Sequence, residues 1–327
     1  MIKETTILVV EDETIIGKDI QSKLQGLGYD APLIIPSGEE AVEKTGELRP
    51  DLVMMDIVIN GGIDGIEAAS QIRKQFNIPV VYLTAYADEE ILERAKITEP
   101  FGYLVKPFDE RELHSTIEMA LYKHKSDERL MKSMEETINA LASALEMRDP
   151  YTAGHQERVA QLAEAIAGEM NCPYDEMRGI RLAALIHDIG KIRVPSEILS
   201  KPGKLTGSEF ELIKVHPQVG YDILKKIEFT WPIADIVYQH HERIDGSGYP
   251  RGLKGDEIMT QAKIIAVADV VEAMASHRPY RAAIGIEGAL EELTENRGIS
   301  YDPDAVDACL KLFREKGFKL EDRTDSW

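Results

Sequence analysis

Seven residues in the second half of the chain combine metal-binding side chains with unusual positions. They are His155, His187, Asp188, His216, His240, His241 and Asp269. His187-Asp188 and Asp269 each follow a long apolar run, so they enter buried regions where a polar group needs a partner. One such residue alone is usually a hydrogen-bonded group of the core. Five histidines and two aspartates together favour metal binding, and this mixture suits iron, manganese, nickel or zinc better than Mg²⁺.

The chemistry that such a group supports is phosphoryl displacement. An aspartate has two carboxylate oxygens and can bridge two ions. Successive helical residues diverge by roughly 100°, which spreads His187 and Asp188 over a metal pair. Two ions ~3.5–4 Å apart stabilise the attacking and leaving oxygens of an in-line displacement, and water on such an ion loses a proton near pH ~7. We therefore expect a phosphodiester to be hydrolysed here.

The densest part of this pattern is the run from His240 to Pro250. It reads His240-His241-Glu242-Arg243-Ile244-Asp245-Gly246-Ser247-Gly248-Tyr249-Pro250. Without the two histidines, its Asp, Gly and Pro residues would indicate an ordinary turn. With them, the run is the strongest single indication of where the centre lies.

A second set of polar residues lies at the ends of predicted strands nearer the N-terminus. Glu11-Asp12-Glu13, Asp56, Thr84 and Lys106 follow four separate apolar runs. In parallel sheets, ligands bind beyond the carboxyl ends of the strands. Clustered carboxylates repel each other unless a cation joins them, and oxygen-only donors suit Mg²⁺. Any one of these residues would more often be a helix cap, but four strand ends together indicate a site.

These strand ends belong to a predicted α/β domain. Short β-branched runs at 7–10, 33–35, 52–55, 80–83 and 102–105 are typical of parallel strands covered on both faces. Segments with helical spacing, roughly 14–27, 38–47, 64–76 and 88–97, accompany them. The pattern predicts a doubly wound, five-stranded parallel sheet.

The rest of the chain is predicted to be helical. No Gly or Pro lies within 109–147, which indicates one or two long linker helices. Within this linker, apolar residues repeat at spacings of three and four, at Met131, Met134, Ile138, Leu141 and Leu145. We favour a homodimer along this seam over packing within one chain. Residues 148–318 form the predicted all-α domain, and 319–327 form a charged tail.

Composition limits the classes of ligand that the protein can bind and indicates where in the cell it works. The formal net charge of -20 over 327 residues argues against broad nucleic-acid binding, although metal ions and local cations can still attract a small anion. Cys172 and Cys309 are far apart, so neither a disulfide framework nor structural zinc is indicated. We see no signal peptide and no membrane-spanning run, and we expect a cytoplasmic protein.

Residues 1–125 resemble a response-regulator receiver domain, which has a flavodoxin-like fold. The resemblance rests on the strand-end residues and on Lys106-Pro107-Phe108. It implies that Asp56 accepts a phosphoryl group from a cognate histidine kinase. It also implies a Mg²⁺ site made by Glu11, Asp12, Asp56 and the carbonyl of Val58, and a switch made by Thr84, Tyr103 and Lys106.

Residues 148–318 resemble an HD-GYP domain, a subset of the HD phosphohydrolases that hydrolyses cyclic di-GMP. The matching stretches are Gly154–Val159, His187–Lys191, Lys201–Thr206, His216-Pro217, His240–Pro250 and Arg278–Arg281. The resemblance implies two transition-metal ions, with iron or manganese ahead of nickel or zinc. His155, His187, Asp188 and Asp269 would hold one ion, and His216, His240 and His241 the other, with Asp188 bridging.

The same resemblance implies contacts with the substrate. Lys191 would act with Asp188 in catalysis by meeting the scissile phosphate or the attacking hydroxide. Arg278 and Arg281 would bind the phosphates, and a loop beside the substrate would include Asp245, Gly246, Gly248 and Tyr249.

Two positions depart from the pattern of the family. Members with a third metal carry a Glu where this chain has Tyr151, so we expect two metals. Glu272 stands where an Asp is usual, which we interpret as a change in the surroundings of the ligands.

Both resemblances together predict a two-component output protein. Phosphorylation of Asp56 would regulate hydrolysis of cyclic di-GMP by the helical domain. Two alternatives stay open. The substrate could be another cyclic dinucleotide such as cyclic GMP-AMP, because the base-reading residues cannot be located. Alternatively, the helical domain could bind cyclic di-GMP or a partner as a non-catalytic signalling module.

Overall fold

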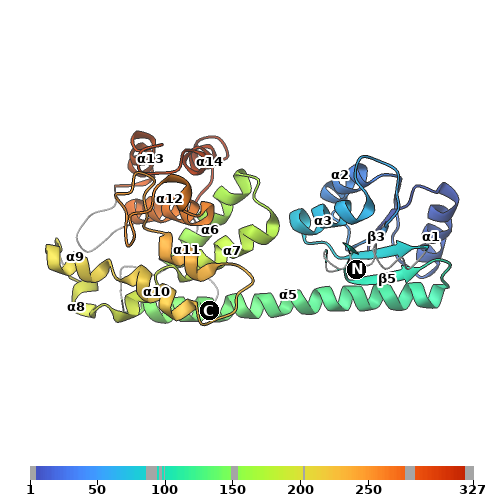
Figure 1. Ribbon diagram of the computed structural model, residues 1–327, viewed down its shortest axis with the longest axis horizontal. Helices are drawn as coiled ribbons and strands as arrows, with labels where there is room; N and C mark the ends of the chain where they lie inside the picture. Colours follow the sequence, from blue (N-terminus) through green and yellow to red (C-terminus); the bar gives the residue numbers. More distant parts are fainter. Residues whose placement is uncertain are drawn as a thin grey trace. The chain divides into compact units, whose positions relative to one another are not determined.

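The chain folds into two compact units, Met1–Lys132 and Ser133–Trp327. The computed structural model describes residues 5–85, 94–95, 98, 100–148, 154–201, 203–276 and 284–320. The first unit contains the predicted sheet and the second is built from helices (Figure 1). Within the described ranges, no helix is both long enough and apolar enough to cross a membrane.

The sheet of the first unit has the predicted architecture. Its strands are β1 (Ile7–Val10), β2 (Ile34–Ile35), β3 (Leu52–Asp56), β4 (Val80–Thr84) and β5 (Gly102–Val105). They pair in the order β2-β1-β3-β4-β5, and every pair is parallel. The predicted doubly wound, five-stranded sheet is therefore confirmed.

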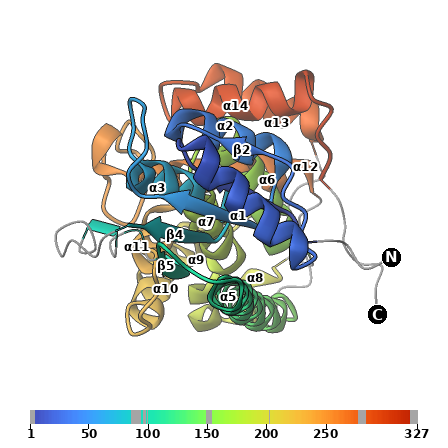
Figure 2. The ribbon, with the colours of Figure 1, turned by 90° about the vertical axis from the view of Figure 1, so that its right-hand side faces the viewer.

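Helices cover both faces of this sheet. In β1, Ile7 and Val9 face one core, which α1 (Thr14–Gly26) and the start of α5 (Glu110–Glu146) complete (Figure 2). Leu8 and Val10 face the other, beneath α2 (Gly38–Leu48) and α3 (Gly65–Phe76). Burial on both faces explains why the strands are apolar at every position. Most of the predicted helix at 88–97 lies outside the described residues.

The predicted linker forms one helix, α5, because nothing between Asp109 and Met147 interrupts it. Only part of the predicted apolar seam along this helix is exposed and could contact a second chain. Ile138 and Leu145 are buried within the second unit, whereas Leu141 is 51% exposed. The periodicity was right for a buried stripe, but part of that stripe packs within the chain. A homodimer along this helix remains a prediction.

The second unit is helical, as predicted. Its elements are α6 (His155–Glu169), α7 (Tyr174–Ile186), η1 (Ile189–Arg193), α8 (Ser196–Leu199), α9 (Gly207–Ile213), α10 (His216–Leu224), α11 (Ile233–Gln239), η2 (Gly255–Glu257), α12 (Thr260–Ala275), α13 (Ile286–Glu295) and α14 (Pro303–Arg314). Among the described residues of this unit, extended pairing is limited to the isolated bridges of Asp245 with Lys254 and of Arg297 with Tyr301.

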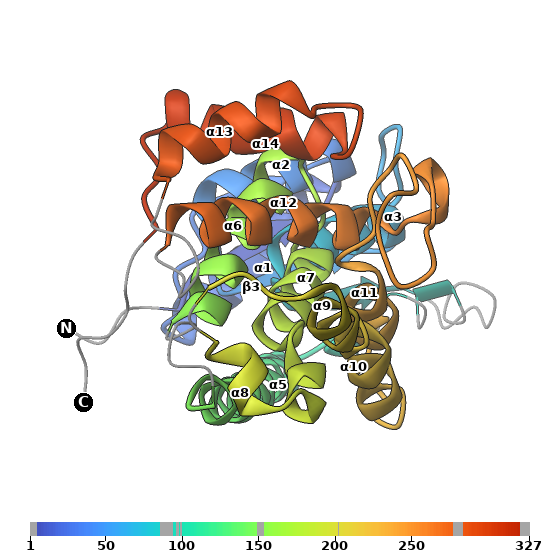
Figure 3. The same cartoon turned by 90° about the vertical axis from the view of Figure 1, so that its left-hand side faces the viewer.

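Two sets of packed helices position the chemistry. In the first set, α6 packs against α7, α12 and α14 (Figure 3). In the second, α10 packs against η1 and α11. The closest approach is at Gly190, where an added Cβ would lie 1.9 Å from the carbonyl oxygen of His216. Glycine at this position therefore lets η1 and α10 touch, which brings His187-Asp188 and His216 together.

Candidate metal centre and receiver site

Most of the predicted metal-binding residues of the second unit lie at helix ends. His155 begins α6 and His216 begins α10, while His187 and His240 directly follow α7 and α11. Asp269 lies within α12. Helix packing rather than sequence proximity therefore assembles them.

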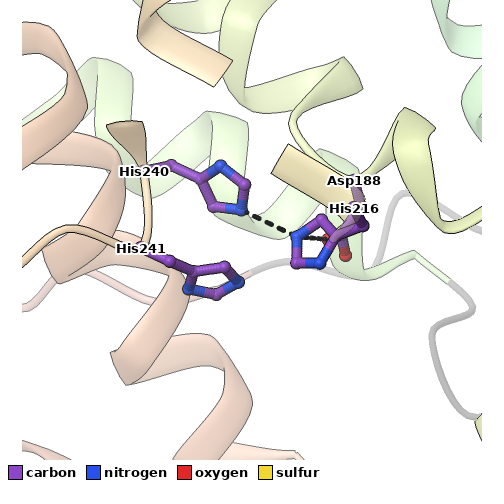
Figure 4. A group of neighbouring side chains, drawn as sticks. All are labelled: Asp188, His216, His240 and His241. Carbon is purple, nitrogen blue, oxygen red and sulfur yellow. Dashed lines mark hydrogen bonds and ion pairs between the residues drawn. The ribbon is translucent and has the colours of Figure 1, made fainter. Parts of the chain in front are cut away.

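One group of donors combines Asp188 with three histidines. The donor atoms of Asp188, His216, His240 and His241 all lie within 4.8 Å of one another (Figure 4). The Nε2 of His216 is 3.2 Å from the Nε2 of His240 and 3.3 Å from Oδ1 of Asp188. Three imidazoles and a carboxylate that converge in this way can hold a transition metal.

The other group consists of His155, His187 and Asp269, whose donor atoms also lie within 4.8 Å of one another. The Oδ1 of Asp269 is 3.4 Å from the Nε2 of His155 and 3.9 Å from the Nε2 of His187. The structure thus brings together all seven side chains that the sequence singled out.

Asp188 lies between the two groups. Its Oδ1 faces His216, while its Oδ2 is 3.5 Å from the Nε2 of His187 and 3.8 Å from that of His155. The buried Oδ1 of Asp188 and Nε2 of His187 have no hydrogen-bond partner among the described residues. Leaving buried polar atoms unsatisfied is costly, and a pair of bridged metal ions would satisfy both.

The orientation of the imidazoles also fits metal binding. The Nδ1 atoms of His187, His216 and His240 lie 2.7, 2.8 and 2.6 Å from the carbonyl oxygens three residues earlier. A carbonyl can only accept, so each Nδ1 carries a proton, and in the neutral ring the Nε2 then has a lone pair for a metal ion. The protonated Nδ1 is the usual outer contact of a metal-binding histidine.

Burial favours the neutral form of two of these imidazoles, those of His216 and His240. It lowers the pKa of His216 to about 4 and that of His240 well below its usual range. Burial alone would raise the pKa of Asp188, but the ammonium of Lys191, whose Nζ is 2.6 Å from Oδ2, and the surrounding imidazoles together lower that pKa well below its usual range. Neutral imidazoles and an ionised carboxylate are the forms that bind metal ions.

The predicted substrate loop lies against this centre through Tyr249. Its ring centroid is 4.7 Å from that of His241 and 6.5 Å from that of His216. Gly248 is required by close packing, because an added Cβ would lie 2.4 Å from the backbone nitrogen of Arg243. Asp245 is exposed; its Oδ1 accepts a hydrogen bond from the Ser247 amide within the loop, and its Oδ2 accepts one from Ser300 at 3.4 Å. Gly246 adopts a positive φ of 83°.

Arg278, Arg281 and Tyr151 lie outside the described residues. The predicted phosphate contacts of the two arginines, and the argument from Tyr151 for two metals, therefore remain predictions.

Two glutamates support the donors from outside. The sequence analysis placed Glu272 in the surroundings of the ligands, and the structure shows which ligand it contacts, whereas Glu146 was not assigned from the sequence. Glu272 is buried. Its Oε2 is hydrogen-bonded to the Nδ1 of His155, and its Oε1 accepts a hydrogen bond from the Nη2 of Arg158 at 2.6 Å. Glu146 accepts from the backbone amides of Gly154 and Gln156 at 3.0 and 3.2 Å, which holds the start of α6. Each contact joins different elements, so motif spacing could not reveal it.

A further such residue shapes the substrate loop. Glu242 is buried and accepts from the amides of Arg251 and Leu253 at 2.7 and 3.0 Å. In the sequence, only its position within the run from His240 to Pro250 indicated a role for Glu242.

The first unit gathers the strand-end residues at one edge of its sheet. Carboxylate oxygens of Glu11, Asp12 and Asp56 lie within 4.8 Å of one another. The Nζ of Lys106 bonds Glu11 and lies 2.5 Å from Oδ2 of Asp56. Burial opposes the charge on Lys106, but the two carboxylates raise its pKa. This edge therefore holds three carboxylates partly neutralised by one lysine.

The remaining predicted receiver residues lie around this cluster. Thr84 ends β4 and is buried, and Tyr103 on β5 has its ring 5.8 Å from that of Tyr82. The amide of Val58 donates to Oδ1 of Asp56 at 3.0 Å. Asn60, which sequence reasoning missed, donates from Nδ2 to Asp12 at 2.5 Å.

Comparison with known proteins agrees with this division. The response regulator receiver domain family matches residues 7–118, and the HD domain family matches residues 139–305. The cyclic di-GMP phosphodiesterase response regulator RpfG of Xanthomonas campestris pv. campestris is 37% identical over 317 residues, covering 90% of this chain and 82% of the relative. The chain belongs to the HD-domain response regulators.

Other relatives of this HD-domain response regulator match nearly all of the chain or about half of it. A cyclic di-GMP phosphodiesterase of Thermotoga maritima is 35% identical over 340 residues, covering 95% of this chain and 91% of the relative. The 3'3'-cGAMP-specific phosphodiesterase 3 of Vibrio cholerae is 40% identical over 178 residues, covering 54% of this chain and 39% of that protein.

Proposed function

We propose that this chain hydrolyses cyclic di-GMP at a dinuclear metal centre and that phosphorylation of Asp56 regulates the reaction. The observation that carries the proposal is the position of Asp188, whose two oxygens face two separate groups of imidazoles. That arrangement is suited to a metal pair, and metal pairs are a recurrent device for phosphodiester hydrolysis. The activity named for RpfG and for the Thermotoga maritima relative supports the same substrate.

The ligand sets follow from the two groups of donors. His155, His187 and Asp269 would hold one ion, and His216, His240 and His241 the other, with Asp188 shared. When bound, the ions supply Lewis-acid activation of water and neutralise negative charge on the phosphate. Imidazole and carboxylate donors together favour iron or manganese, with nickel and zinc as alternatives.

The chain's own residues supply orientation and charge. Lys191, 2.6 Å from Asp188, is one of the groups that favour the ionised form of this carboxylate, and its ammonium is a local cation for the scissile phosphate. The backbone carbonyls that accept from Nδ1 fix the rings of His187, His216 and His240. Hydrolysis adds one water across one P–O bond of the cyclic dinucleotide and yields the linear form, which a second hydrolysis would divide into GMP.

The receiver unit would provide control. A phosphoryl group on Asp56, delivered by a histidine kinase and aided by Mg²⁺ at Glu11 and Asp12, adds concentrated negative charge. That charge would compete for Lys106, which now contacts Asp56. Thr84 and Tyr103 would respond, as the switch residues of a receiver do.

The proposal is tested with the full chain loaded with Fe²⁺ or Mn²⁺. Cyclic di-GMP should be converted to pGpG or GMP, measured by chromatography, and the rate should change after phosphorylation. An intact, metal-loaded sample that forms neither product would refute the proposal. Phosphorylation that leaves the rate unchanged in wild type would refute only the regulatory part.

A second candidate substrate is 3'3'-cGAMP. The observation that favours it is the 40% identity to the 3'3'-cGAMP-specific phosphodiesterase 3 of Vibrio cholerae over 178 residues, 54% of this chain. Parallel steady-state assays with both dinucleotides decide between them, because a true substrate preference appears as a higher kcat/KM.

A further inference from the structure

Aromatic rings extend outward from the candidate metal centre. The ring of Tyr249 lies 4.7 Å from that of His241 at an interplanar angle of 34°. Beyond it, the ring of Phe210 lies 6.4 Å from Tyr249 in an edge-to-face arrangement at 80°. Phe210 belongs to α9, and only two residues separate this helix from His216. The row of rings therefore begins at the donors and ends at α9.

Phe210 is not part of a hydrophobic core. No residue of α9 is buried, and Phe210 itself is 43% exposed. The helix is held instead by polar contacts, because Thr206 and Glu209 form a capping box and Lys201 bonds Glu209 at 2.7 Å. A large aromatic ring exposed on such a helix leaves apolar surface in contact with water, and a ligand that covered this surface would gain free energy.

A cation accompanies these rings. The Nζ of Lys214 lies 5.0 Å from the centroid of Phe210 and 5.9 Å from that of Tyr249. It also contacts Glu211 at 2.7 Å, but its side chain stays 32% exposed. In a chain with a formal net charge of -20, a lysine here makes the approach to the centre locally favourable for an anion.

Rings beside an ammonium match the chemistry of a nucleotide. Every nucleobase has a π-face that stacks on an aromatic side chain, and lysine pairs with phosphate as a point charge. We propose that Phe210 and Lys214, together with Tyr249, form a subsite for one purine base and its adjoining phosphate. The inference rests on the proposed function, since the ligand is one half of the cyclic dinucleotide whose other phosphate is cleaved.

The experiment uses steady-state hydrolysis of cyclic di-GMP by the metal-loaded full chain. Phe210→Leu keeps an apolar side chain but removes the ring, and Lys214→Met keeps the stem but removes the charge. Each should raise KM by roughly tenfold or more, as expected for loss of one stacked base or one phosphate contact, with a smaller effect on kcat. If α9 had only a structural role, the variants would instead lower kcat and the melting temperature and leave KM unchanged.

Matched controls come from the same unit. Phe318→Leu also removes a partly exposed aromatic ring, and Phe318 pairs with Phe313 at 5.4 Å on another part of the fold. Lys225→Met removes a lysine in an equivalent setting, because Lys225 contacts Asp222 at 2.5 Å and lies 5.2 Å from the ring centroid of Tyr221. Neither control should change KM.

A binding measurement reports stacking directly. The probe is 2-aminopurine riboside 5′-monophosphate, a monoester whose fluorescence is quenched when its base stacks on an aromatic ring. Wild type should quench it, Phe210→Leu should quench less, and Lys214→Met should bind it roughly tenfold more weakly. If wild type hydrolyses cyclic di-GMP, but KM and the quenching of the probe are the same in both variants as in wild type, the proposed subsite is wrong and the proposed function stands. Absence of hydrolysis in wild type would instead overturn the proposed function.

Discussion

The Nε2 of His216 lies 3.3 Å from Oδ1 of Asp188, while the second oxygen of the same carboxylate faces His187 at 3.5 Å. One carboxylate is thus shared between imidazoles that belong to two groups of donors. Each group would lose an oxygen donor if Asp188 were removed, and Lys191 would lose the carboxylate that it contacts. The whole centre therefore depends on this residue more than on any single histidine.

Asp188→Ala should lower the metal content of the purified chain from about two ions to fewer than one and reduce turnover of cyclic di-GMP by at least roughly a hundredfold. The reason is that both ions lose their shared ligand. Metal content is measured by inductively coupled plasma mass spectrometry. Asp235→Ala removes an exposed aspartate of α11 and should alter neither quantity. Retention of two ions by Asp188→Ala would show that this carboxylate is not a shared ligand.

Glu272→Gln should weaken binding at the His155 group by roughly 10–100-fold, the usual effect of losing an outer contact of a metal-binding histidine. The carboxylate bonds the Nδ1 of His155 and is itself held by Arg158. A glutamine keeps the volume but cannot accept at both positions. Titration calorimetry with Mn²⁺ measures the affinity, and Glu291→Gln on the exposed side of α13 serves as control. Equal affinity in Glu272→Gln and wild type would mean that this contact only stabilises the fold.

The donor set was predictable because its members lie in short motifs. His187-Asp188 and His240-His241 each place two donors next to each other, and the apolar runs before them indicated burial. In the same way, the strand ends were predictable because parallel strands bring their carboxyl ends to one edge. Local sequence was enough in both cases.

Contacts between distant elements were not predictable from the sequence. Glu272 and His155 are separated by 117 residues, and Asn60 and Asp12 by 48. Likewise, the spacing of Ile138 and Leu145 predicted a buried stripe but not whether another chain or this one would bury it. Periodicity specifies which side of a helix is apolar, whereas its partner depends on packing.

Glu164 and Glu157 should respond oppositely to replacement by glutamine. Burial raises the pKa of Glu164 above its usual 4.5, although Arg181 lies 3.3 Å away. The folded chain therefore holds this proton more tightly than the unfolded chain, so ionisation of Glu164 costs stability as the pH rises above about 4.5. Glu164→Gln should raise the melting temperature at about pH 7 and have little effect near pH 4.

Glu157→Gln is the matched contrast. Both oxygens of Glu157 accept from Nη2 of Arg181, at 2.9 and 3.2 Å. Losing these charged hydrogen bonds should cost about 1–3 kcal/mol at neutral pH. Thermal unfolding of the metal-free chain between about pH 4 and pH 7 checks both variants. A gain in stability that is the same for Glu164→Gln at every pH would rule out ionisation as its cause.

Lys106→Met should increase the affinity of the receiver unit for Mg²⁺ by roughly tenfold. The ammonium of Lys106 contacts Asp56 and Glu11 and offsets their charge, so removing it leaves a more negative cluster for the ion. Titration calorimetry with Mg²⁺ measures this, and Lys23→Met provides the control because Lys23 pairs with Asp19 on α1. The same variant should respond less to phosphorylation of Asp56, since the cation that the phosphoryl group attracts is missing. Weaker Mg²⁺ binding by Lys106→Met would mean that the lysine organises the carboxylates rather than competing with the ion for them.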